Sequence, residues 1–236
     1  MADAFRIYIG WDSREPEAYD VAKFSLERRA SIPVAVIPLK VDELRARGLY
    51  GRDKDPLAST EFTYTRFLTP AVAGYSGWAL FCDSDFLWLG DVAGLLDYTH
   101  TPSKAVFCVQ HDYQPKDTVK MDGAVQTIYP RKNWSSLMLF NCEHPSVRRL
   151  TPDVVSRETG AYLHRMQWVA DDEVGALPVE WNWLEGWNKK PEQGTPNAVH
   201  FTRGGPWFEN WQNVDYGDLW RAEFGEMQRS RQRVSV

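Results

Sequence analysis

The chain has 236 residues, of which 43% are hydrophobic and 25% charged, and its formal net charge is -5 at pH 7. This composition is typical of a globular protein with one sizeable core, and it argues against a disordered chain. The negative net charge also disfavours binding to nucleic acid through bulk charge.

The apolar pattern predicts strands that alternate with helices. Short alternating or continuous apolar runs indicate strands, and apolar side chains three to four positions apart indicate helices. In chain order we expect a strand over 5–10, a helix over 15–29, a strand over 32–39, a helix over 62–72, strands over 78–82 and 105–110, a loop over 111–132, a strand over 137–140, a helix that begins in 145–151, a short helical turn over 172–177, a strand over 198–202 and a helix within 216–226. Prolines in 32–39 favour an edge strand. Such alternation predicts a layered α/β sheet.

Two carboxylates interrupt an apolar run in the middle of the chain. Asp83 and Asp85 follow the predicted strand 78–82, and apolar residues resume at Phe86. Asp is rarely buried unless it is paired or bound to a metal. In an extended chain both side chains point to one face, where they can hold a hard divalent cation. The alternative is an ordinary turn, in which Asp is also common.

A second polar group lies near the C-terminus. His200 is in the predicted strand 198–202, and Arg203, Gly204 and Gly205 follow it. A Gly-Gly turn leaves backbone N–H groups open to an anion, and Arg203 adds a positive charge. One imidazole and two carboxylates form a set that suits manganese. A histidine at a strand end is otherwise commonly structural.

Ligands of layered α/β sheets gather at the carboxyl ends of strands, where residues 10–12 also lie. Arg66, in the predicted helix 62–72, is either a surface residue or a contact to a diphosphate or sugar. Asp171 and Asp172 are either a solvated helix start or a carboxylate that faces a reacting carbon.

In this order the motifs resemble a known family. They are the Gly-x-Asp of residues 10–12, the Tyr-x-Arg that ends at Arg66, the Asp-x-Asp of 83–85 and the His-Phe…Gly-Pro-Trp of 200–207. The pattern is similar to that of retaining glycosyltransferases of the glycogenin and bacterial lipopolysaccharide galactosyltransferase type, which form glycosyltransferase family 8 and have the GT-A fold. The similarity extends over residues 5–210.

The resemblance implies a single glycosyltransferase domain over 1–236, built on one Rossmann-like mixed sheet flanked by helices, with an aromatic-rich C-terminal part. Residues 5–110 would be the nucleotide-binding half, 111–210 the half that binds the acceptor and closes the metal site, and 211–236 a C-terminal helix and tail. The implied metal ligands are Asp83, Asp85 and His200, the implied donor-binding residues are Gly10, Trp11, Asp12, Arg66, Ser84, Ser136, Arg203 and Gly205, and the implied catalytic residues are Asp172 and Asp171.

Three positions depart from the family pattern. Trp134-Ser135-Ser136 stands where Asn-Ala-Gly is usual, and Asp172 stands where the family has Gln. Gly205 replaces a Lys that would contact the diphosphate, so Arg203 is the expected substitute for its charge.

The reaction that this resemblance implies is sugar transfer from a nucleotide-diphosphate sugar, with UDP-sugar the first expectation, to a hydroxyl of a glycan or glycolipid. The expected cofactor is Mn²⁺ or Mg²⁺, which would offset the charge on the leaving diphosphate. Asp172 would act as nucleophile or stabiliser, and front-face attack by the acceptor is the alternative. Two other functions remain open: a phosphohydrolase of the haloacid-dehalogenase type, with Asp171-Asp172 as its second metal pair, and a non-catalytic binder of nucleotide sugars.

Location is predicted from cysteines and termini. The three cysteines stand far apart in apolar runs, and residues 1–4 resemble no signal peptide, so we expect a reduced, cytoplasmic protein. The basic stretch 229–233 is either a solvated tail or a weak contact with the inner face of a membrane.

Overall fold

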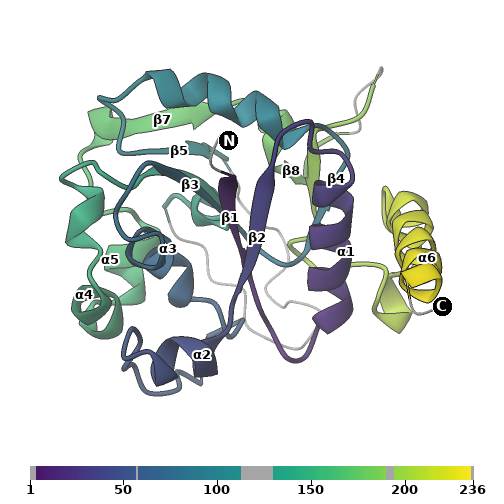
Figure 1. Cartoon of the computed structure of the whole chain (residues 1–236), viewed down its shortest axis with the longest axis horizontal. Coiled ribbons are helices and arrows are strands. Elements are labelled where there is room, and N and C mark those ends of the chain that lie inside the picture. Colours follow the sequence, from purple (N-terminus) through teal and green to yellow (C-terminus); the bar gives the residue numbers. More distant parts are fainter. Residues whose placement is uncertain (1–3, 57, 113–129, 190–193, 235–236) are drawn as a thin grey trace.

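The computed structural model describes residues 4–56, 58–112, 130–189 and 194–234 (Figure 1). Helices flank a six-stranded sheet, and a three-stranded sheet lies beside it. The strands are β1 (Phe5–Gly10), β2 (Val34–Leu39), β3 (Trp78–Cys82), β4 (Phe86–Trp88), β5 (Val106–Val109), β6 (Leu137–Asn141), β7 (Val174–Leu177), β8 (Trp183–Leu184) and β9 (Ala198–His200). The α-helices are α1 (Pro16–Glu27), α2 (Val41–Ala46), α3 (Thr69–Val72), α4 (Pro152–Arg157), α5 (Gly160–His164) and α6 (Gly217–Val234).

The large sheet has the order β2-β1-β3-β6-β5-β7. β6 runs antiparallel to both of its neighbours, and the other five strands share one direction. The prediction of a mixed sheet is therefore confirmed, and β2 is an edge strand, as its prolines indicated. The prediction of a single sheet was incomplete, because β4, β9 and β8 form a second sheet.

Side chains alternate between the two faces of the large sheet. In β1, Ile7 and Ile9 share one core cluster with Leu26 of α1, and Tyr8, on the other face, shares a second cluster with Leu163 of α5. Figure 1 accordingly shows α1 on one side of β1 and β2, and α3, α4 and α5 on the other. Helices cover both faces of the sheet, so the ends of the strands are where a ligand can approach.

Two predicted helical segments differ from the structure. The segment 145–151 holds a 3-10 turn, and α4 begins only at Pro152, because the Thr151 hydroxyl accepts a hydrogen bond from the Val154 N–H and proline suits the first helical position. Within 172–177 the helical turn ends at Glu173, and β7 comes next, paired in parallel with β5.

Other expectations hold with changed boundaries. The predicted helix 62–72 is a 3-10 turn over Thr65–Leu68 followed by α3. Most of the predicted loop 111–132 lies outside the described residues. The predicted helix within 216–226 is longer and forms α6, whose buried Glu223 pairs with two arginines at the end of α1. Among the described residues, no helix combines the length and apolarity needed to cross a bilayer.

Candidate active site

Most residues of the predicted site lie at one end of the strands of the large sheet, which is called the site edge below. β1, β3 and β5 end there and β6 begins there, because β6 runs opposite to the other strands. The backbone N–H of Asp83, just after β3, donates to the Ser136 carbonyl at 2.9 Å, just before β6. The expectation that polar residues converge at carboxyl strand ends is therefore confirmed for this edge.

The predicted metal ligands lie together. Asp83, Asp85 and His200 each offer a ligand atom, and these atoms lie within 4.8 Å of one another. The cluster exists because the chain passes from β3 to β4 through the buried Ser84, and β4 pairs with β9 so that Phe86 lies opposite His200. The His200 Nε2 is 3.3 Å from the Asp85 Oδ1.

His200 is held by neighbours on both sides. Its Nδ1 is 3.0 Å from the Asn182 Oδ1, and its ring stacks on Phe86 with 4.6 Å between centroids. Asn182 is fully buried, and its amide donates to the Ser136 hydroxyl at 2.8 Å. When Nδ1 carries the proton, Nε2 presents its lone pair to the cluster, which is the usual arrangement of a metal-binding histidine.

Arg66 contacts the cluster through Asp83. Its Nη1 is 2.7 Å from the Asp83 Oδ1 and 2.9 Å from the Ser135 carbonyl oxygen, and its side chain is only 7% exposed. Arg66 therefore positions Asp83. A contact from Arg66 to a donor stays a prediction.

Asp12 is engaged by protein groups, and its role beside a nucleoside stays a prediction. It is 1% exposed, and it pairs with the Arg14 guanidinium through Oδ1 at 2.9 Å and Oδ2 at 2.7 Å. Its Oδ2 also accepts from the Glu61 N–H. Burial raises the pKa of Asp12, but the hydrogen bonds from Arg14 and Glu61 outweigh this effect and lower it overall. Asp12 thus joins two loops, and its neighbours face the ligand space.

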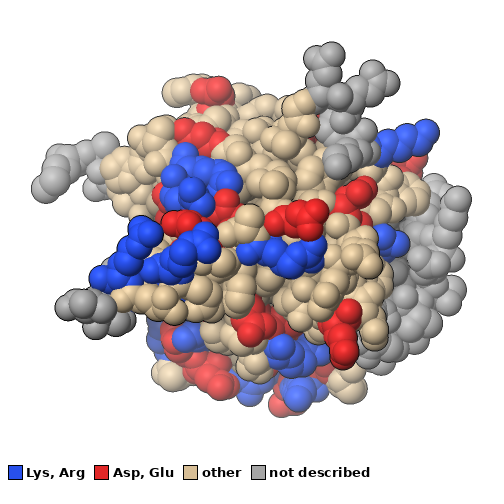
Figure 2. All heavy atoms as spheres, turned by 90° about the vertical axis from the view of Figure 1, so that its right-hand side faces the viewer, with Lys and Arg blue, Asp and Glu red and all other residues tan. Residues whose placement is uncertain are grey.

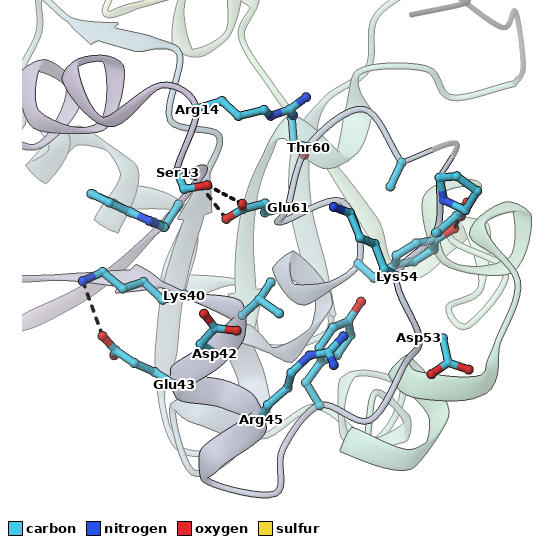
Figure 3. Close-up of a pocket in the computed structure, with 17 residues that line it drawn as sticks. Ser13, Arg14, Lys40, Asp42, Glu43, Arg45, Asp53, Lys54, Thr60 and Glu61 are labelled. Carbon is cyan, nitrogen blue, oxygen red and sulfur yellow. Dashed lines mark hydrogen bonds and ion pairs between the residues drawn. The ribbon is translucent and has the colours of Figure 1, made fainter.

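That space is a pocket of about 800 Å³ at the ends of β1 and β2 (Figure 3). Its lining includes Trp11, with the Lys40 ammonium 4.8 Å from its ring centroid. The lining residues are 11, 13, 14, 40–43, 45, 50, 53–56, 58, 60, 61 and 64. Figure 3 shows Ser13 bonded to Glu61 on one wall and Lys40 paired with Glu43 on another. A side chain at Gly10 would meet the ring of Phe62 at 2.5 Å, so glycine permits this close packing below the pocket.

Glu15 links the two ends of the chain at this site. It precedes α1, and its Oε2 accepts from the Trp207 Nε1 at 3.0 Å. Burial, with smaller contributions from Asp85 and Asp12, raises the pKa of Glu15 to about 7. The carboxylates of Asp12, Glu15, Asp83 and Asp85 therefore lie near one another at the site edge, which is a reason to expect a cation there.

The raised pKa predicts a pH effect on stability. The folded chain holds a proton on Glu15 between pH 4.5 and 7, and unfolding releases it, so this contribution to the free energy of unfolding falls as pH rises through that window. We expect the wild type to lose on the order of 2 kcal/mol relative to Glu15→Gln between about pH 4.5 and 7.5, since one pKa unit is about 1.4 kcal/mol and partial exposure reduces the effect. Urea unfolding in EDTA measures this difference. A constant gap between the two proteins would contradict it.

Arg203 and Gly205 also lie differently from expectation. The Arg203 Nη2 is 3.4 Å from the Glu185 Oε2, and the guanidinium packs over Trp211. The Gly204 N–H donates to the Phe201 carbonyl, and a side chain at Gly205 would clash with the ring of Trp207. The turn is therefore packed against protein, with a carboxylate neutralising Arg203. Their donor-binding roles stay predictions.

The structure does not bring Asp171 and Asp172 to the cluster, which corrects their predicted catalytic role. They precede β7, the far edge strand, and the Asp172 carbonyl accepts from Lys104, which precedes β5. Both side chains are exposed. β7 lies three strand spacings from β3, roughly 14 Å to the side, and its start is at the opposite end of the strands. Among the described residues, the group that could hold a metal ion does not include these two aspartates.

His111 belongs to the site although none of the sequence motifs contains it. It follows the carboxyl end of β5, is 9% exposed and lies beside Asn182 and His200. Burial, and then the charge of His200, lower the pKa of His111 to about 3, while Asn182 raises it by less. At neutral pH the ring is therefore uncharged, with one donor and one acceptor nitrogen. The sequence signal that could have identified His111 was its position as a polar residue just after the predicted strand 105–110.

Comparisons with known proteins place the fold. No family model matches the chain. Among solved structures, the bifunctional glycosyltransferase WbbM has a TM-score of 0.64 with 17% identity, and GlyE of Streptococcus pneumoniae has 0.62 with 14%. These matches cover 97% and 99% of this chain, but the chain spans only 52% of WbbM and 64% of GlyE. The galactosyltransferase LgtC, solved with donor and acceptor sugar analogues, has a TM-score of 0.59 with 13% identity over 94% of this chain and 96% of its own.

These structures show that the chain has the fold of GT-A glycosyltransferases. A closer relationship comes from sequence: the chain is 50% identical over 232 residues to Protein CDI of Arabidopsis thaliana, a match that covers 97% of this chain and 89% of that protein. The chain therefore belongs to the same family as Protein CDI.

Proposed function

We propose that this chain is a metal-dependent glycosyltransferase that moves a sugar from a nucleotide-diphosphate sugar, with UDP-sugar the expected donor, to a hydroxyl of a glycan or glycolipid. The observation that carries the proposal is the convergence of Asp83, Asp85 and His200 at the sheet edge that also bears the 800 Å³ pocket. Similarity to glycosyltransferases that include a complex with donor and acceptor analogues supports it.

The three side chains of the cluster fit a divalent cation. Two carboxylates and an imidazole, the latter oriented by Asn182, suit Mn²⁺ better than Mg²⁺, which prefers oxygen ligands. A bound ion would supply positive charge to the departing diphosphate. Arg66 keeps Asp83 in place for this purpose, and Asn182 does the same for His200.

The strand order suggests how a donor lies. The pocket at β1 and β2 would take the nucleoside, with Trp11 as its aromatic wall, and the cluster after β3 would take the diphosphate. The sugar would then lie over the start of β6, where Ser135 and Ser136 are small. Because Asp171 and Asp172 are remote, we propose retention by front-face attack of the acceptor.

A thermal-shift panel of UDP-, GDP-, ADP- and dTDP-sugars, each with and without Mn²⁺, tests the proposal. A donor at about 100 times its Kd adds about 2.7 kcal/mol to the free energy of unfolding, which raises the midpoint by roughly 5–10 °C. We expect this rise only when Mn²⁺ is present and expect EDTA to abolish it. A rise that survives EDTA unchanged would refute the metal assignment.

A non-catalytic binder of nucleotide sugars is the second candidate. The remote position of Asp171 and Asp172 and the pairing of Arg203 with Glu185 favour it. Metal-dependent binding in the panel without hydrolysis or transfer would support this candidate. The phosphohydrolase alternative loses its second metal pair, because Asp171 and Asp172 do not lie with Asp83 and Asp85.

We also propose a cytoplasmic location, with membrane contact through the tail as a weaker proposal. Arg229 pairs with Glu226, and Arg231 pairs with Asp20 of α1. Figure 2 looks onto the side of the molecule where α6 lies and shows acidic side chains interspersed among the basic ones. This mixture reduces the attraction to an anionic surface.

A further inference from the structure

We propose that His111 binds a hydroxyl of the transferred sugar and so helps to determine which sugar the site accepts. This inference rests on the proposed function. It concerns a residue that the motifs do not contain, and four features of the structure support it.

The first feature is position along the sheet edge. The order β2-β1-β3-β6-β5 places the pocket, the metal cluster and His111 in sequence, with neighbouring strands about 4.8 Å apart. A nucleoside, a diphosphate and a sugar succeed one another in the same sequence in the donor. A donor whose diphosphate lies at Asp83 and whose nucleoside lies in the pocket therefore directs its sugar toward β6 and β5.

The second feature is a fixed backbone. The His111 N–H donates to the Val109 carbonyl at 3.1 Å, and the His111 carbonyl accepts from the Trp134 Nε1 at 2.9 Å. The Trp134 ring in turn lies under the Arg131 guanidinium. A residue held at both backbone groups presents its imidazole in one place, which suits the recognition of a hydroxyl.

The third feature is an unused nitrogen. Among the described residues, no group lies in hydrogen-bonding geometry to the buried His111 Nε2, although the Asn182 side chain lies near the ring. A buried polar atom without a partner costs about 1–3 kcal/mol, so its retention needs a reason. A sugar hydroxyl both donates and accepts, so it can satisfy an imidazole nitrogen whether or not that nitrogen carries a proton.

The fourth feature is a contrast within the chain. His164 is partly buried, and its Nδ1 lies 2.8 Å from the Ser135 hydroxyl while its ring packs edge-on against Phe67. These contacts are typical of a structural histidine. His111 is more buried, its Nε2 has no such partner among the described residues, and its ring lies near Asn182 and His200, where the donor would react.

The test separates the sugar from the rest of the donor. His111→Phe keeps the ring shape and removes the nitrogens, whereas His111→Gln returns a polar atom near the position of Nε2. Calorimetric titration with Mn²⁺ present would measure the Kd for the nucleotide sugar that binds best in the panel, and for its own nucleoside diphosphate. His144→Phe is the control, because His144 follows β6 at the opposite edge of the sheet.

We expect His111→Phe to weaken nucleotide-sugar binding about tenfold, since one hydrogen bond contributes about 1.4 kcal/mol, while the Kd for the diphosphate changes less than about twofold. His111→Gln should recover part of the loss, and His144→Phe should change neither Kd. Equal weakening of both ligands, or of neither, would overturn the inference while the proposed function stands. If the wild type binds no nucleotide at all, the proposed function fails and the inference fails with it.

Discussion

Asp85→Asn is expected to lower kcat/KM for the Mn²⁺-dependent reaction by about 100- to 1000-fold, the effect of removing one group that stabilises charge in a transition state. The substitution keeps the shape of the side chain and removes the charge that faces the His200 Nε2 at 3.3 Å. Mn²⁺ affinity should fall in parallel, since a neutral amide is a weaker ligand than a carboxylate. Steady-state rates across a Mn²⁺ titration, with calorimetry on the same samples, measure both effects.

Asp172→Asn is the matched control. It makes the same chemical change at an exposed residue before β7, far from the cluster, so its activity should stay near that of the wild type. An Asp172→Asn variant as inactive as Asp85→Asn would show that the exposed pair reaches the reacting carbon after all. Full activity of Asp85→Asn in EDTA would remove the metal from the mechanism.

The local sequence pattern was enough to predict that Asp83, Asp85 and His200 lie together. Asp83 and Asp85 are adjacent in sequence to a continuous apolar run, and burial of that run fixes where the carboxylates emerge. His200 obeys the same logic at the end of β9. Each residue is tied to its own strand, so the direction of that strand decides its place in the fold.

Asp171 and Asp172 could not be placed this way. Their position depends on the next element of the chain: a helix would have carried the backbone across the layer before the next strand, but β7 begins at Val174 and pairs directly with β5. The two aspartates are thereby fixed at the amino end of an edge strand. Motif order alone carries no information about the length of a connection.

The residues that hold the cluster in place could not be predicted from the local sequence pattern either. Nothing in the sequence indicates that Arg66 approaches Asp83 or that Asn182 holds His200, because these contacts join segments distant along the chain. Arg14 is the exception, since it stands two residues from Asp12 and the turn folds it back. The distant contacts become visible only when the order of the strands is known.

Arg66→Met is expected to lower the free energy of unfolding by about 3–5 kcal/mol, because it leaves the carboxylate of Asp83 without its buried counter-charge. The guanidinium is 7% exposed, lies 2.7 Å from that carboxylate and 5.3 Å from the ring centroids of Phe62 and Phe81. Urea unfolding in EDTA measures the loss. Arg157→Met is the control: its pair with Asp153 on α4 is 72% and 67% exposed, so we expect a change below about 1 kcal/mol.

The double variant Arg66→Met/Asp83→Asn separates charge from packing. If the loss comes from the uncompensated carboxylate, neutralising Asp83 should restore part of the stability. Mn²⁺ should then stabilise Arg66→Met more than it stabilises the wild type, because the ion and the guanidinium neutralise the same carboxylate. A single variant no less stable than Arg157→Met would contradict the ion pair of Asp83 with Arg66, and an identical Mn²⁺ effect in both proteins would contradict Asp83 as a metal ligand. The two roles assigned to this aspartate thus depend on one measurable competition between Arg66 and the cation.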